Sequence, residues 1–165
     1  MRLFFIFFIC IFYSFTGVAE PYRQRISESF TIDTYTGDTL NLNQLLGYYL
    51  TFDFTSNVGF HVGSSWAITG QYGGYGTVSF GPQFFIPVST SLSLVLTPMI
   101  GVGGHAALPL GNGLLFWSHV GLNYKFNNSI SLLFNYGAMN YVNRLYKVST
   151  ICIGVQHSYD IFLKK

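Results

Sequence analysis

Charged residues are scarce in this sequence. Asp, Glu, Lys and Arg make up 8% of its 165 residues, whereas ordinary soluble domains contain about 25%. The net charge of +2 is spread thinly and includes no basic run, which argues against a nucleic-acid partner, because such partners require clustered Lys and Arg. Half of the residues are hydrophobic and 19% are aromatic. The chain therefore has few charged residues with which to cover a water-exposed surface.

Cysteine is nearly absent as well. Cys10 lies in an N-terminal apolar run, which leaves Cys152 as the only cysteine in the rest of the chain. A single thiol cannot form an intramolecular disulfide. The domain must therefore be held together in another way, and a closed ladder of strands would suffice.

The N-terminus has the pattern of an export signal. Arg2 provides the positive start, an apolar core covers residues 3–15, and small residues precede a cleavage site after Ala19. An uncleaved membrane anchor is the alternative, but the run is short for the roughly 20 residues of a spanning helix. We expect a signal peptide at 1–19 and one domain at 20–165.

Hydrophobic and polar residues alternate from Leu114 to Met139. Such alternation predicts strands, because successive side chains of a strand point to opposite faces. Asn127-Asn128-Ser129 interrupts the pattern with turn-forming residues. The segment is therefore predicted to be a hairpin with one apolar face.

The same alternation continues through most of the chain after residue 25. It predicts eight strands and no helix, at 26–36, 40–54, 58–68, 78–88, 92–102, 114–126, 130–139 and 148–163. The loops are placed at 70–74, 108–113 and 141–147. Pro82, Pro87 and Pro98 lack the backbone donor that a ladder needs, so we expect local bulges or strand ends there.

The apolar face stays on even numbers through the first seven strands. This parity requires odd-numbered hairpin loops, and three short turns fit at 56–58, 89–91 and 127–129. Longer connections alternate with these short turns, as in outer-membrane barrels. A sheet in hydrocarbon cannot leave an edge unpaired, so the first strand should pair with the eighth.

The polar face decides whether the apolar face meets lipid or a ligand. In a soluble barrel the apolar face would point inward, and the outer face would carry many charges. Here the polar face is mostly Gly, Ser, Thr, Asn and Gln, which suits a narrow lumen. We therefore predict an all-β, eight-stranded, antiparallel, up-and-down transmembrane β-barrel. A soluble periplasmic ligand-binding barrel is the alternative.

With its export signal, eight alternating strands, three short turns and Phe162 near the C-terminus, the chain resembles the small eight-stranded outer-membrane proteins of Gram-negative bacteria. The resemblance implies an outer-membrane location and a structural or surface-interaction role, without a cofactor. Eight strands are too few for a diffusion pore. The expected partners are outer-membrane lipid and lipopolysaccharide and the barrel-assembly machinery. Nucleic acid is not expected, and we expect a monomer.

One enzymatic family within this group, the lipid A deacylases, is similar at residues 98–103 and 120–126. Those enzymes carry a His-x-Ser pair on the next strand, where i and i+2 share a face and the base can reach the nucleophile. Here Asn135 and Gly137 occupy the matching positions, and neither can serve. We therefore assign no catalytic residue. A lipid-modifying enzyme, or an inactive relative of one, is the alternative function.

Several residues of the polar face could still form a site. His105 and His119 are predicted to lie nearly opposite each other on adjacent strands, which makes them weak candidates for a metal site. Four more polar residues are predicted to form a structural network in the lumen: Asp53, His61, Lys125 and Asp160. Cys152 should face the lumen, and His157 should lie on the apolar face near the short-turn end.

Overall fold

The computed structural model describes residues 23–36, 42–70, 74–104, 113–142 and 147–162. Within these ranges no helix is long and apolar enough to cross a membrane. The predicted signal peptide at 1–19 lies outside the described residues. The strands are β1 (Arg23–Thr36), β2 (Leu42–Asp53), β3 (Val58–Gly70), β4 (Gly76–Pro87), β5 (Leu92–Gly104), β6 (Leu114–Lys125), β7 (Ile130–Tyr141) and β8 (Lys147–Phe162).

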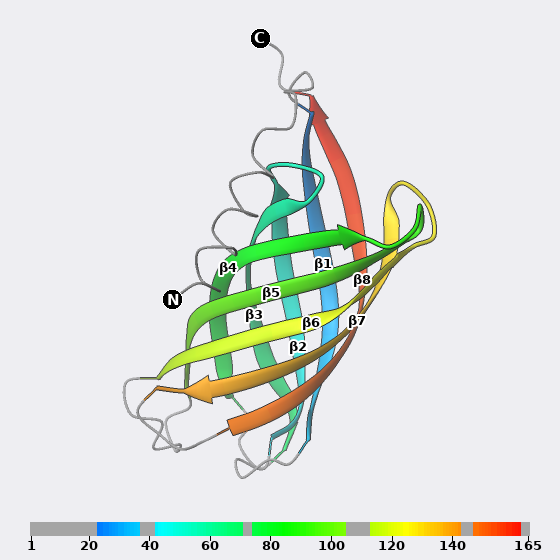
Figure 1. Ribbon diagram of the computed structural model, residues 1–165. Helices are drawn as coiled ribbons and strands as arrows, with labels where there is room; N and C mark the ends of the chain where they lie inside the picture. Colours follow the sequence, from blue (N-terminus) through cyan, green and yellow to red (C-terminus); the bar gives the residue numbers. More distant parts are fainter. Residues whose placement is uncertain (1–22, 37–41, 71–73, 105–112, 143–146, 163–165) are drawn as a thin grey trace, which may run out of the picture.

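The eight strands form one closed antiparallel barrel in which each strand pairs with its neighbours in the sequence (Figure 1). β1 closes the barrel against β8 in an unbroken register from Arg23 opposite Phe162 to Thr36 opposite Ser149. The predicted fold class and the predicted pairing of first and last strands are therefore confirmed. Closure leaves no strand edge along the wall, as a membrane requires.

The predicted faces are confirmed as well. Outward positions carry even numbers in β1 to β7 and odd numbers in β8, and they expose large apolar side chains such as Phe30, Phe80, Phe134 and Ile153. Most inward positions are buried, Cys152 among them. The apolar face thus forms the outer wall, which excludes the soluble alternative.

The three short turns share one hydrogen-bonding pattern. In each, a side-chain oxygen at the first loop position accepts two backbone N–H groups, two and three residues later. Asn127 Oδ1 accepts from Ser129 and Ile130 at 2.8 Å each, and Thr55 and Ser89 have the same role in their turns. The β2–β3 loop is therefore 55–57, one residue earlier than predicted.

We expect Asn127→Ala to lower the free energy of unfolding by roughly 1 kcal/mol, because two turn N–H groups lose their acceptor. Urea unfolding in lipid vesicles measures this change. Asn128→Ala is the matched control, because the backbone carbonyl of Asn128, not its side chain, accepts a bond from Arg25. Equal effects of the two changes would contradict the role of the Asn127 side chain.

Pro82 and Pro98 interrupt the pairing of β4 with β5 without shifting its register. Pairing between β4 and β5 stops at Phe80 opposite Ile100 and resumes at Phe84 opposite Leu96. The shared register places Pro82 opposite Pro98, so the two missing donors fall in the same pair. The predicted bulges are therefore wrong at these two positions, whereas Pro87 ends β4 as predicted.

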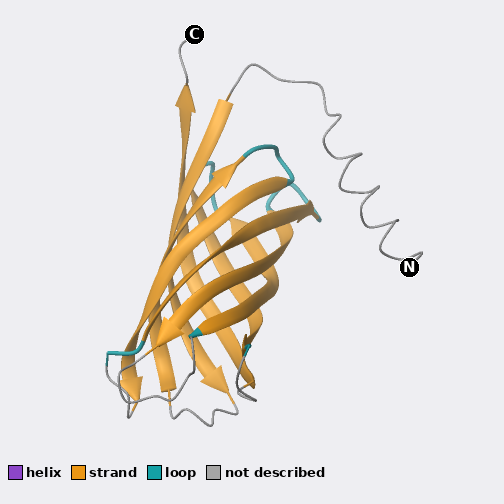
Figure 2. Ribbon diagram, turned by 90° about the vertical axis from the view of Figure 1, so that its left-hand side faces the viewer, coloured by secondary structure: helices purple, strands orange, loops and turns teal. Residues whose placement is uncertain are grey.

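Two strands extend beyond the rest at the short-turn end (Figure 2). β1 pairs with β8 as far as Arg23 opposite Phe162, beyond the last β2 partner of β1 at Arg25. At the other end, Tyr141 lies in β7 and is buried, although the sequence placed it in a loop. In the sequence, a tyrosine that faces inward at the end of a strand cannot be distinguished from a tyrosine in a loop, because both lie where the alternation stops.

Candidate functional site

Large side chains fill the lumen and pack against glycines at inward positions. A methyl group on Gly63 would overlap the Tyr48 carbonyl oxygen and the Tyr49 ring, and one on Gly137 would overlap the His119 ring. The small residues therefore make room for large ones across the barrel. The result is a packed interior, as expected of eight strands.

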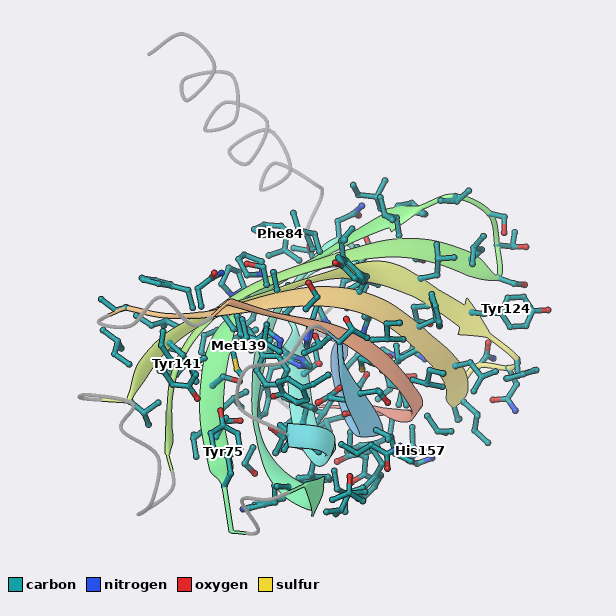
Figure 3. The ribbon with its side chains drawn as sticks, turned by 90° about the horizontal axis from the view of Figure 1, so that it is seen from below. Tyr75, Phe84, Tyr124, Met139, Tyr141 and His157 are labelled. Carbon is teal, nitrogen blue, oxygen red and sulfur yellow. The ribbon has the colours of Figure 1, made fainter. Side chains whose placement is uncertain are left out.

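An apolar cluster fills the lumen toward the long-loop end. It consists of Tyr35, Leu45, Tyr75, Met99, Leu115, Trp117, Met139, Tyr141 and Val148. The hydroxyls of Tyr75 and Tyr141 are hydrogen-bonded to each other, and the Tyr75 hydroxyl also lies 3.8 Å from the sulfur of Met139 (Figure 3). This cluster was not predicted from the sequence, because the inward positions are mostly Gly, Ser, Thr, Asn and Gln and were interpreted as a polar face.

Nearer the short-turn end, a chain of hydrogen bonds links four strands, β2 to β5. His61 Nδ1 and Thr51 Oγ1 are 2.8 Å apart, and Thr51 also donates to Gln83 Oε1 at 3.1 Å. Gln83 Nε2 then donates to Thr97 at 3.0 Å. Tyr49 stacks on His61 with ring centroids 4.9 Å apart. His61 therefore belongs to a neutral network, separate from the charged residues with which it was grouped.

His119 lies opposite Thr97 in the β5–β6 register. The expectation that His119 faces His105 is therefore wrong, and His105 lies outside the described residues. The ring of His119 packs edge-on against Trp117 at 4.8 Å. In the described parts of the chain, no three His, Cys, Asp or Glu side chains are grouped so as to hold a metal ion.

The remaining predicted lumenal residues gather at the short-turn rim. Arg25 lies opposite both Asp53 on β2 and Asp160 on β8. Asp53 is attracted by Arg25 and Lys125 and repelled by Asp160. The structure thus brings Asp53, Lys125 and Asp160 together around an arginine that sequence analysis did not include.

The positions that match the deacylase pair face the lumen. Asn135 is buried and its Nδ2 lies 3.8 Å from Cys152 Sγ. Gly137 is packed against His119 and Thr150. Neither residue has a side chain that can act as a nucleophile or a base.

One polar cluster lies on the outer wall. Glu28 faces outward from β1, opposite His157 of β8. Its Oε2 accepts the Tyr48 hydroxyl at 3.2 Å, and its Oε1 lies 3.6 Å from His157 Nδ1. Sequence analysis placed His157 correctly but overlooked Glu28. Glu28 could have been identified from the sequence, because it is an acidic residue at an even position on the apolar face.

No protein-family model matches the chain, and no curated protein matches its sequence. Solved structures do match. The N-terminal β-barrel domain of Pseudomonas aeruginosa OprF aligns with a TM-score of 0.68 at 10% identity, over 84% of this chain and 100% of that one. A designed transmembrane β-barrel aligns with a TM-score of 0.62 at 13% identity, over 86% and 98%. The outer membrane enzyme PagL aligns with a TM-score of 0.54 at 18% identity, over 79% and 98%.

These likenesses, at low identity, establish the fold. The chain has the fold of the small eight-stranded outer-membrane β-barrels. Its apolar outer wall and closed ladder meet the conditions for spanning a membrane with strands. The fold and the wall together are those of a transmembrane β-barrel of the outer-membrane type.

Proposed function

We propose that this chain is a non-enzymatic barrel with a structural or surface-interaction role in the outer membrane. The observation that carries the proposal is the packed lumen. Trp117, Leu115 and Met139 are fully buried in it, and its inward glycines have no room for a methyl group. Such an interior neither conducts solutes nor accommodates a ligand of ordinary size.

The partners expected from the resemblance belong to the same proposal. They are outer-membrane lipid, lipopolysaccharide and the barrel-assembly machinery, and the barrel acts as a monomer. The outer wall supports the lipid partner, because apolar side chains cover it on all eight strands.

The purified full chain should show no steady ion conductance in planar lipid bilayers, because side chains block the lumen. A porin inserted into the same bilayer serves as the positive control. Trp66→Ala, which changes the outer wall only, should behave as the wild type does. Reproducible conductance steps from the wild-type chain would contradict the closed lumen.

A lipid-modifying enzyme is the alternative role. Asn135 and Gly137 argue against the deacylase design, because neither can act as its base or its nucleophile. Incubation of the folded chain with lipopolysaccharide should therefore release no acyl chain. Release by the wild type would overturn the non-enzymatic proposal, whatever the conductance result.

A further inference from the structure

We propose that Glu28, Tyr48 and His157 form a binding site for the headgroup of an ethanolamine phospholipid on the outer wall. The inference rests on the membrane-spanning placement of the wall and goes beyond the proposed function. Among the outward positions of the described strands, Glu28 is the one carboxylate and His157 the one imidazole. The register places these two residues directly opposite each other.

An outward carboxylate is informative because charge on a lipid-facing wall is unfavourable. This cost depends on depth and is smallest near the headgroups. The cluster lies at that level, since His157 is opposite Ile130, the first residue of β7, and Ser158 donates to the Ser129 carbonyl of the adjoining short turn. A bound counter-charge would stabilise Glu28 there.

The surroundings of Glu28 select a cation. Its two oxygens have Tyr48 and His157 as neighbours, whereas an ionised carboxylate can accept about four hydrogen bonds. Phe30 packs against Tyr48 at 4.9 Å, and Tyr159 packs against His157 at 5.7 Å. Aromatic rings beside a carboxylate favour a cation, and the three N–H donors of a primary ammonium match the free acceptor positions.

The imidazole adds a second recognition element. Nδ1 of His157 faces Glu28, and its side chain is 53% exposed. The other ring nitrogen, Nε2, is left to donate an N–H to a phosphate oxygen, which two carbons separate from the ammonium in this headgroup. The cluster therefore fits a zwitterionic headgroup with both charges.

The position of the cluster selects the leaflet. Short turns of outer-membrane barrels face the periplasm, and the periplasmic leaflet consists of phospholipid. The site therefore fits phosphatidylethanolamine in that leaflet, and lipopolysaccharide in the opposite leaflet is out of its reach.

Native mass spectrometry of the full chain, released from detergent micelles with equal amounts of phosphatidylethanolamine, phosphatidylglycerol and phosphatidylcholine, tests this site. We expect the wild type to retain phosphatidylethanolamine roughly fivefold more than either competitor, as one ion-paired ammonium contact would give. Glu28→Gln should abolish this preference. Its folding is checked by the shift in gel mobility between unheated and boiled samples.

A matched pair of variants provides a second measurement that preserves folding. Tyr48→Phe removes the hydroxyl that donates to Glu28, and Tyr124→Phe removes a hydroxyl elsewhere on the outer wall. We expect about a twofold loss of preference in Tyr48→Phe only. Equal retention of the three lipids by the wild type, or equal effects of the two tyrosine changes, would overturn the proposal, as would an unchanged preference in Glu28→Gln.

Discussion

Gly63→Ala is expected to lower the free energy of unfolding by about 3 kcal/mol, the upper part of the range for overpacked cores. The added methyl group would overlap the backbone carbonyl of Tyr48 and the ring and Cα of Tyr49. The backbone atoms belong to a hydrogen-bonded ladder and cannot move far. The Tyr49 ring also stacks on His61, so moving it away from the added methyl group would disturb that contact.

Gly104→Ala is the control for this change. A methyl group on Gly104 would meet no atom within 4 Å, so the same substitution should shift stability by less than about 0.5 kcal/mol. Reversible urea unfolding in lipid vesicles, followed by tryptophan fluorescence, measures both variants. Similar stabilities of the two variants would show that the lumen is loosely packed, which would contradict a closed, non-conducting barrel.

Val120→Arg is expected to destabilise the folded barrel by about 2–4 kcal/mol, because it places a charge at mid-wall in hydrocarbon. Val120 lies in the middle of β6, faces outward and is 44% exposed. In a soluble protein an arginine at such an exposed position would have little effect. The same vesicle-based unfolding measurement applies.

Tyr124→Arg is the matched control on the same strand. Tyr124 is 47% exposed, but it lies next to the last residue of β6, at the short-turn end. A charge there reaches the headgroups, and the expected cost is about 0–1 kcal/mol. If Val120→Arg and Tyr124→Arg had the same small effect on stability, the outer wall could not be in contact with lipid.

Much of the outer wall could be predicted from the sequence, because the pattern that forms it is local. A side-chain period of two needs only neighbouring residues, so the strands, their outward faces and the lumenal position of Cys152 could all be predicted. The three short turns have the same local origin, since Thr55, Ser89 and Asn127 bond to backbone groups within three residues. A chain with an apolar wall and few charges must also close, because water cannot satisfy a strand edge in lipid.

The contacts inside the lumen depend instead on the pairing register between strands, which short sequence patterns determine poorly. The predicted pairing of His105 with His119 centres the β5–β6 connection on position 112, whereas Val102 opposite Leu114 centres it on position 108. This difference of a few residues is enough to place Thr97, and not His105, opposite His119. Loop length on its own therefore could not locate the cross-strand neighbours of a lumenal residue.

The sequence by itself determined that this protein is an eight-stranded barrel with apolar residues outside and small polar residues inside. Only the tertiary structure decided that the apolar cluster fills one end of the lumen, and that Glu28 lies opposite His157 where β1 pairs with β8. The physical reason is separation along the chain. Glu28 and His157 are 129 positions apart (157 − 28), and closure of the barrel, not any local preference, brings them together.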